Sequence, residues 1–353
     1  MKYQQLAAIL RIEVQTLIHQ GQSKLPSEAK LSAQYHMSRQ TVRHALQLLE
    51  DEGLIQRRKG SGAHIIHSGA DSVRQIAVIT TFSDDYIFPS ILHDIRSCFK
   101  EAGYNTIHFT TENKVSQERA ILTNLLEQKI CAVLIEGSKT ALPTPNSDLY
   151  IALKQREIPV LFLHGCYSNL QGFPCLFDDN FSGGYHLTQY LLSIGHIKIA
   201  GIFKSDDIQG PQRYHGMVSA LRDHHISLQD DTFFWYNTED RASLVKSEYC
   251  TLLDNFIQKQ LQFVTAVVCY NDEIAYYLIK QLLKTGRKVP EDIAVVSFDN
   301  SFYSKISPVP ITSLAHKNKR TGIVAATLLL DALSGKQERS LCMGWDLIKR
   351  AST

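Results

Sequence analysis

The chain has 353 residues, 44% hydrophobic and 20% charged, which predicts a globular protein of two or three domains rather than a disordered one. No apolar run approaches the roughly 18 residues of a membrane helix, and the first residues lack the pattern of an export signal, so we expect a cytoplasmic protein without membrane contact. The seven cysteines form no CxxC pair; we expect reduced thiols, with no disulfide, metal site or cofactor.

The charge is unevenly distributed along the chain. Residues 1–68 carry nine cationic and five anionic side chains, a net +4, whereas the whole chain carries only +2. A basic head on a faintly acidic body indicates that the head binds a polyanion. We therefore expect three parts: a polyanion-binding head over residues 1–67, a linker over 68–74 and a separate body over 75–353.

Three helices are expected in the head. Leu6, Leu10 and Val14 recur at helical spacing and predict a first helix that ends at Gly21. The stretch "LPSEAKLSAQY" predicts a short second helix, and "SRQTVRHALQLLEDEG" predicts a third helix that Ser38 caps. Two short helices separated by about three residues are typical of a helix-turn-helix.

Long polar side chains gather at the start of the third helix. Arg39, Gln40, Arg43 and His44 face away from its apolar side, at the end that enters a DNA major groove, where Arg can bind guanine and Gln can pair with adenine. Thr41 and the helix N-terminus can hold a phosphate. An ordinary solvated charged face remains the alternative for these residues taken alone.

A strand, a tight turn and a second strand are expected from "GLIQRRKGSGAHII", which predicts a two-stranded wing. The glycines do not suit a nucleotide loop, because Ile65 stands where a dinucleotide loop needs its third glycine and no helix follows. A P-loop needs Gly-Lys-Ser/Thr, whereas the order here is Lys-Gly-Ser. We expect Arg57, Arg58 and Lys59 to contact DNA phosphates.

The head resembles the winged helix-turn-helix of the GntR family of bacterial transcription regulators. The resemblance rests on "LPSE", on Ser38-Arg39-x-Thr41-Val42-Arg43, on "GLI" and on the two wing glycines. It implies binding of operator DNA through the residues that match Arg39, Thr41 and Arg43, and Ala29 stands where many members carry a base-reading arginine. The expected DNA-binding residues are Lys2, Tyr3, Glu28, Ser38, Arg39, Gln40, Thr41, Arg43, His44, Arg58, Lys59, Gly60 and Ser61.

In the body, apolar runs of strand length alternate with amphipathic helical segments, which predicts an α/β fold of parallel sheets covered by helices. The expected strands are 76–80, 106–109, 130–135, 159–163, 196–203, 266–270 and 293–298. The expected helices are 91–101, 117–128, 181–194, 212–224, 243–260 and 272–285.

Polar residues follow several of these strands, and ligands of parallel sheets bind beyond the carboxyl ends of the strands. Carboxylates, amides and an arginine suit a polyhydroxylated ligand, and Phe82 or Tyr86 can stack on a sugar ring. Helix capping is the alternative for each residue alone, but six converging strand ends favour a pocket. The expected ligand-binding residues are Phe82, Asp85, Tyr86, Glu136, His164, Asp179, Lys204, Arg213, Asn271 and Asp299.

An enzyme is the competing interpretation of the same carboxylates. The sequence contains no GxSxG, HExxH or Walker motif, so we expect no catalytic residues. A sugar-handling enzyme fused to a DNA-binding head remains an alternative that turnover of the bound sugar would reveal. A transport-associated sugar-binding protein would need an export signal and would have no use for the basic head.

The body resembles the effector domain of the LacI/GalR repressors, which is itself similar to periplasmic sugar-binding proteins. The resemblance rests on "GIFKSDDIQGPQRYHG", "TAVVCYNDEIAYYLIKQLLKTGRKVPEDIAVVSFDNS" and "PITSLAHK". It implies sugar contacts at the positions matching Arg213, Asn271 and Asp299. We expect two lobes, residues 75–177 with 308–353 and residues 178–307, that hinge near Asp178 and Ser301.

A GntR-type head on a LacI-type body is similar to the arabinose-responsive repressors of Gram-positive bacteria, which implies that the ligand is L-arabinose or a close pentose. The pocket residues alone indicate only a small polyol, so another pentose or a hexose remains an alternative ligand. Activation of transcription remains an alternative to repression. We expect a homodimer, with residues 89–101 as its face, that binds a pseudo-palindromic operator and is released by a small sugar inducer.

Overall fold

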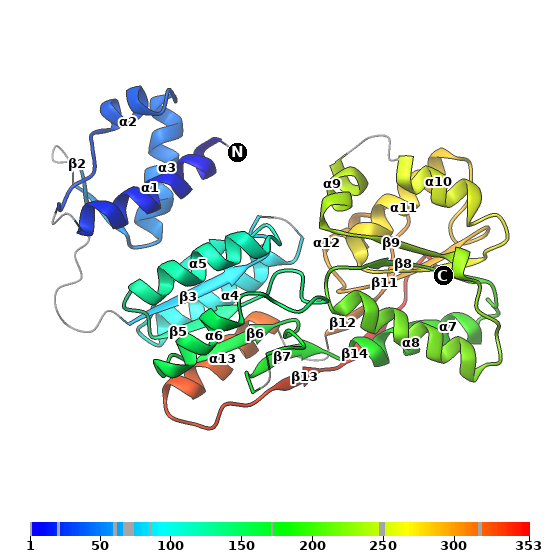
Figure 1. The fold of residues 1–353 in the computed structure, drawn as a ribbon. Coiled ribbons are helices and arrows are strands. Elements are labelled where there is room, and N and C mark those ends of the chain that lie inside the picture. The colour runs from blue at the N-terminus through cyan, green and yellow to red at the C-terminus, as the bar shows by residue number, and fades with distance from the viewer. Residues whose placement is uncertain are drawn as a thin grey trace. The chain divides into compact units, whose positions relative to one another are not determined.

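The computed structural model describes residues 2–19, 22–58, 62–65, 74–84, 86–170, 172–246, 251–316 and 320–353. The chain separates into two compact units, Met1–Gln75 with Gly103–Ile107 and Ile76–Ala102 with His108–Thr353 (Figure 1). None of the helices in the described part combines the length and apolar character that crossing a bilayer requires.

The head is a small helical bundle with a β-ribbon. It contains α1 (Lys2–His19), α2 (Glu28–Gln34), α3 (Arg39–Asp51), β1 (Ile55–Arg58) and β2 (Gly62–Ile65), and the two strands pair in antiparallel. The hydroxyls of Ser27 and Ser38 accept hydrogen bonds from the first turns of α2 and α3, so both serines cap their helices, as expected for Ser38. The predicted winged helix-turn-helix is therefore confirmed.

The body contains two six-stranded sheets, one in each lobe. The first-lobe sheet has the order β13 (Leu341–Met343), β7 (Cys175–Asp178), β6 (Val160–Leu163), β5 (Ala132–Ile135), β3 (Gln75–Thr80) and β4 (Asn105–Thr110). The second-lobe sheet has the order β14 (Trp345–Ile348), β12 (Thr312–His316), β11 (Ala294–Phe298), β10 (Ala266–Cys269), β8 (Ile199–Lys204) and β9 (Phe233–Tyr236). Neighbouring strands around both sheet centres are parallel, as the alternation predicts.

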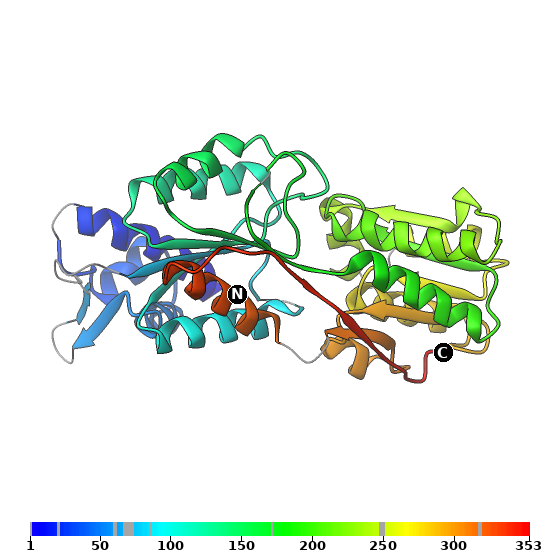
Figure 2. The ribbon, with the colours of Figure 1, turned by 90° about the horizontal axis from the view of Figure 1, so that it is seen from below.

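Helices cover both faces of each sheet (Figure 2). The first lobe has α4 (Phe88–Glu101), α5 (Val115–Glu127), α6 (Ser147–Gln155) and α13 (Thr321–Leu333). The second lobe has α7 (Asn180–Ser193), α8 (Gln209–Asp223), α9 (Thr238–Lys246), α10 (Thr251–Lys259), α11 (Asp272–Lys284), the short α12 (Phe302–Ile306) and a 3₁₀ turn at Asp230–Thr232. The helix expected over 243–260 overlaps the end of α9 and all of α10, and residues 247–250 lie outside the described residues.

The carboxyl-terminal segment corrects the predicted lobe boundaries. Residues 308–353 were expected in the first lobe, but β12 pairs with β11 and β14 pairs with β12, so both strands belong to the second lobe. Only α13 and β13 of this segment lie in the first lobe. The hinge predicted near Ser301 is therefore wrong, because the chain crosses between the lobes after β7, between β12 and α13, and between β13 and β14.

Helices α7 and α8 approach each other at their backbones. A Cβ atom on Gly184 would lie 2.1 Å from the carbonyl oxygen of Arg213, and one on Gly216 would lie 2.0 Å from that of Phe181. Backbone carbonyls cannot move aside as a flexible side chain can. The two glycines therefore fix the spacing of α7 and α8, and with it the position of Arg213.

We expect Gly216→Ala to reduce the free energy of unfolding by about 1–3 kcal/mol, because the added methyl group overpacks this helix contact. Urea unfolding monitored by circular dichroism measures the loss. Gly344→Ala is the control, since nothing lies within 4 Å of the position of its Cβ atom. Equal stability of the Gly216→Ala variant and the control would contradict the assignment of helix spacing to Gly216.

Candidate functional site

A cleft lies between the two lobes, at the carboxyl ends of both parallel sheets. The first lobe contributes residues that follow β3, β5 and β6, and the second contributes residues at the ends of β8, β9, β10 and β11. The location agrees with the rule that parallel sheets bind ligands beyond the carboxyl ends of their strands.

Eight of the ten expected ligand residues line this cleft, namely Phe82, Tyr86, Glu136, His164, Lys204, Arg213, Asn271 and Asp299. Asp85 lies outside the described residues. Asp179 does not line the cleft, which corrects the sequence prediction. Its carboxylate accepts a hydrogen bond from the Ser182 amide at 3.0 Å and caps α7, so the local capping role accounts for this residue.

The cleft also contains polar residues that the sequence reasoning missed, namely Thr81, Asp207, Gln209, Tyr236, Arg241, Tyr270 and Glu273. Asp207 and Tyr270 follow predicted strands, in "FKSDD" and "CYND" of the two stretches quoted above for the body. A search of every residue at a strand end would have found them. Arg241 and Glu273 lie on α9 and α11, and no local pattern marks them.

Among the described residues, every cation that lines the cleft is paired with a carboxylate that also lines it. The pairs among the described residues are Glu136 with His164 at 2.8 Å, Lys204 with Asp207 at 2.5 Å, Arg213 with Asp299 at 3.5 Å, and Arg241 with Glu273 at 2.9 Å. With His164 protonated, the charges of the described cleft residues cancel. The cleft therefore offers charged donors and acceptors side by side without a net charge.

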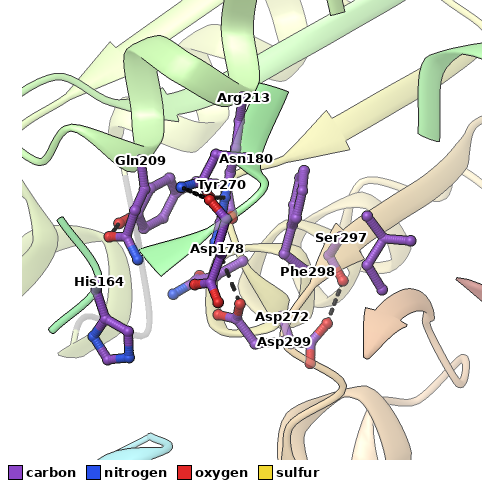
Figure 3. A network of polar contacts seen from close by, with 12 residues as sticks. His164, Asp178, Asn180, Gln209, Arg213, Tyr270, Asp272, Ser297, Phe298 and Asp299 are labelled. Atoms are coloured by element: carbon purple, nitrogen blue, oxygen red, sulfur yellow. Dashed lines mark hydrogen bonds and ion pairs between the residues drawn. The ribbon is translucent and has the colours of Figure 1, made fainter. Parts of the chain in front are cut away.

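Arg213 is the most enclosed of these charges, with 1% of its side chain exposed. Its Nε donates to Asn180 Oδ1 at 2.9 Å, a second nitrogen donates to the Tyr270 carbonyl, and its guanidinium lies 4.1 Å from the centre of the Phe298 ring (Figure 3). A buried guanidinium is costly unless its N–H groups have hydrogen-bond acceptors and its charge has a partner. The network holds Arg213 against Asp299 at the cleft floor.

Glu136 and His164 form the charged pair of the first lobe. Glu136 Oε2 accepts a hydrogen bond from the Thr81 amide at 3.0 Å, and its other oxygen contacts His164 Nδ1. Burial disfavours the charged imidazole, but the hydrogen bond and charge of Glu136 outweigh burial and raise the pKa of His164 to about 9. His164 Nε2 is buried without a partner among the described residues, so it presents a donor to the cleft.

The two aromatic residues of the loop after β3 reach across to the second lobe. The Tyr86 hydroxyl donates to Asp299 Oδ2 at 2.5 Å, and its ring stacks on Tyr303 with the ring centres 6.1 Å apart. Phe82 lies under the guanidinium of Arg241 at 4.7 Å. Both rings already have protein partners, which differs from the expected stacking on a sugar ring.

In the head, the polar residues at the start of α3 are accessible. Arg39, Gln40, Arg43 and His44 are exposed, and the structure gives Arg39 no hydrogen bond or ion pair to any described residue. Arg43 is paired with Glu28 of α2 at 2.8 Å, and the ring of His44 packs edge-on against Tyr3. The arrangement leaves a row of long polar side chains on one surface of α3.

The remaining expected DNA contacts differ in their surroundings. The hydroxyls of Ser38 and Thr41 lie 2.9 Å apart at the start of α3. Arg57 Nε donates to Glu50 Oε2 at 2.7 Å within the head, and its role as a phosphate contact stays a prediction. Lys59, Gly60 and Ser61 lie outside the described residues, as do the side chains of Lys2 and Arg58.

Comparisons with known proteins agree with this architecture. Residues 2–65 match the bacterial regulatory proteins of the gntR family, and residues 188–353 match a periplasmic binding protein-like domain. The transcription regulator CcpA of Lactococcus lactis has the same fold in its body, with a TM-score of 0.68 and 22% identity over 80% of this chain and 99% of that chain. The chain is therefore a bacterial transcription regulator with a GntR-type head and a periplasmic-binding-protein-like body.

Two relatives match nearly the whole chain. It is 34% identical over 323 residues to the arabinose metabolism transcriptional repressor of Halalkalibacterium halodurans, covering 90% of this chain and 84% of the relative. It is 31% identical over 349 residues to the repressor of that name from Geobacillus stearothermophilus, covering 97% of this chain and 94% of the relative. The chain belongs to the family of the arabinose metabolism transcriptional repressors.

The stabilising effect of the Glu136–His164 pair should depend on pH. Because the folded pKa of His164 is above its ordinary value of 6.5, the stabilisation is complete below pH 6.5 and is lost as the pH rises through 9. We expect His164→Gln to lower the free energy of unfolding near pH 6 by up to about 3 kcal/mol, and the difference from the wild type to narrow by pH 9.5.

Urea unfolding across this pH range measures that difference. His186→Gln, which removes an exposed histidine of α7, is the control for a general effect of losing an imidazole. A difference between wild type and His164→Gln that stays constant from pH 6 to 9.5 would show that Glu136 does not hold His164 in its charged form.

Proposed function

We propose that the protein is a transcriptional repressor that binds a pseudo-palindromic operator as a homodimer and is released when L-arabinose fills the interlobe cleft. The observation that carries the proposal is the pairing of every cleft cation with a cleft carboxylate among the described residues. The family membership supports the repressor class and L-arabinose as the sugar.

Paired charges suit a neutral sugar better than a charged metabolite. Each sugar hydroxyl both donates and accepts, so it can donate to a carboxylate and accept from the adjacent cation. A sugar phosphate would need surplus cations, and an amino sugar would need a surplus carboxylate, because an unpaired charge in an enclosed site is costly. The cleft therefore favours an unphosphorylated, uncharged polyol, a class that includes L-arabinose and other pentoses or hexoses.

The proposed DNA interface is the exposed row on α3. One helix-turn-helix reads one half-site, so a two-fold dimer suits a pseudo-palindromic operator. We propose that the exposed face of α4, within residues 89–101, contributes to the dimer, since its other face packs against α13. The protein would act in the cytoplasm, where operator DNA and the imported sugar meet.

Release of DNA would follow from closure of the lobes on the sugar. A ligand shifts the lobes toward the state that it binds more tightly, by its difference in affinity for the two states. A coupling free energy of about 1–3 kcal/mol corresponds to a roughly 5- to 150-fold loss of operator affinity. Loss of one head's contact also removes the advantage of a bivalent grip.

The relatives are repressors rather than enzymes, and we assign no catalytic role to the cleft residues. The alternative of a sugar-handling enzyme makes a distinct claim about the fate of the ligand. Recovery of L-arabinose unchanged after incubation with the protein separates the two functions.

We expect Arg39→Ala to reduce discrimination between operator and random DNA by about 1–3 kcal/mol, because one bidentate base contact is lost. Titration of labelled operator and random duplexes at one salt concentration measures the ratio. Arg222→Ala removes the same charge from an exposed position on α8 and should leave the ratio unchanged. An unchanged ratio for Arg39→Ala would remove this residue from the base-reading surface.

We expect L-arabinose to raise the melting temperature and to release operator DNA, and L-arabinose 5-phosphate to do neither. Asp299→Ala should abolish both sugar effects and retain operator binding, whereas Asp231→Ala, at an exposed carboxylate of the second lobe, should behave as the wild type. A panel of neutral pentoses and hexoses tests the class of ligand. Binding of phosphorylated sugars without binding of any neutral sugar would refute the proposal.

A further inference from the structure

The lobes also meet on a second surface, beside the cleft. The first lobe contributes Asn113, Thr140 and Gly165, and the second contributes Asp206, Asp207 and Ile208; we name these six residues the interlobe latch. Asp207 is the one latch residue that also lines the cleft. The carboxylate of Asp206 also lies 3.5 Å from Lys204 Nζ, so the latch meets the ligand site at two neighbouring carboxylates.

Asn113 is a fully buried polar residue, and both its side-chain nitrogen and its side-chain oxygen make hydrogen bonds. Its Nδ2 donates to Asp207 Oδ1 at 3.0 Å and to Thr238 Oγ1 at 2.6 Å, both in the second lobe. Its Oδ1 accepts from the Lys139 amide at 2.7 Å in its own lobe. Its backbone is left-handed, with φ of 56°, an arrangement that asparagine tolerates better than most residues. The amide thus bridges the lobes in a fixed orientation.

Two backbone amides make further hydrogen bonds between the lobes. The Ile208 amide donates to Thr140 Oγ1 at 3.1 Å, and the Ala141 amide donates to the Asp206 carbonyl at 3.2 Å. Exchange of these two amide hydrogens with solvent requires the hydrogen bonds to open. Their exchange rates therefore report on the latch whether or not a ligand is bound.

Gly165 leaves no space for a side chain at this contact. A Cβ atom at this position would lie 2.4 Å from Ile208 Cγ2. Such a distance requires one partner to shift, and the partner here belongs to the other lobe. Gly165 does not have a left-handed backbone, so alanine fits the local conformation and its methyl group would act as a wedge between the lobes.

The latch reaches the ligand site through the two oxygens of Asp207. Oδ1 accepts from Asn113, while Oδ2 pairs with Lys204 Nζ at 2.5 Å in the cleft. A hydrogen bond to one carboxylate oxygen fixes the direction of the other. Separation of the lobes would remove the Asn113 donor and free the carboxylate to rotate, so the position of the Lys204–Asp207 pair depends on closure.

We propose that Asn113 is a positioning residue that completes the sugar site from outside the cleft, and that Gly165 is required because closure of the latch leaves no room for a side chain. The inference rests on the proposed sugar-binding function. It adds that Asn113 and Gly165 make sugar binding depend on closure of the two lobes. Sugar would bind tightly only when the latch contacts are formed. Bound sugar would therefore hold the two lobes in the closed position.

The test uses the full chain in four forms: wild type, Gly165→Ala, Gly165→Ala with Ile208→Ala, and Asn113→Ala. We expect Gly165→Ala to accelerate hydrogen exchange at the Ala141 and Ile208 amides and to weaken L-arabinose binding at least about ten-fold. The second substitution removes the colliding Cγ2 and should restore slow exchange at Ala141 and most of the affinity. Asn113→Ala should also weaken sugar binding.

The two readouts separate the latch from the sugar proposal. If the wild type binds no neutral sugar, the proposed function fails, and the exchange rates alone then decide whether the latch exists. Unchanged exchange in Gly165→Ala overturns the latch. Accelerated exchange with wild-type affinity for L-arabinose in Gly165→Ala or Asn113→Ala overturns the positioning role. Gly344→Ala controls for adding a methyl group, and Asn113→Ser replaces Asn113→Ala if the latter does not fold.

Discussion

The buried guanidinium of Arg213 is the constraint on which the ligand-binding half of the second lobe depends. A charge with 1% exposure is tolerated only where its partners are fixed, because an unpaired buried charge costs several kcal/mol. Those partners come from the start of α7, the end of β10 and the end of β11. Gly184 and Gly216 bring α7 and α8 into backbone contact at the same place. The need to pair the charge of Arg213 therefore aligns α7, β10 and β11 where they reach the cleft.

Each charged pair of the cleft lies within one lobe, so the lobes can move apart without breaking it. Glu136 and His164 both belong to the first lobe, and the other three cleft pairs lie entirely within the second. Opening of the cleft would therefore separate no charged pair of its lining. Two hydrogen bonds that join the lobes at the cleft, from Tyr86 to Asp299 and from Asn113 to Asp207, have uncharged donors and carboxylate acceptors. Such contacts contribute modestly to closure and leave each carboxylate with its own cation when they break.

Local signals in the sequence were sufficient for the fold of the head and for about half of the residues that line the cleft. Serine caps and helical spacing are properties of a few adjacent residues, and strand ends in a parallel sheet converge whatever the rest of the fold does. The strands β12 and β14 gave no such signal, because their lobe is decided by pairing with β11 and with each other across a long stretch of chain. Arg241 and Asn113 were missed for the same reason, since their partners Glu273 and Asp207 are far away in sequence. Asp179 shows the reverse error, where a local helix cap resembled a ligand contact.

The contact of Tyr86 with Asp299 shows that one carboxylate can line the ligand cleft and also join the two lobes. Its hydroxyl binds Oδ2 of Asp299, while Arg213 lies 3.5 Å from Oδ1, so the carboxylate is held between a donor from each lobe. Asp207 repeats the arrangement with Asn113 and Lys204. In both cases a residue of the first lobe orients a second-lobe carboxylate that lines the cleft. A hydroxylated ligand placed between the two carboxylates would gain its full set of acceptors only in the closed arrangement, and that difference in affinity is the free energy available to shift the lobes.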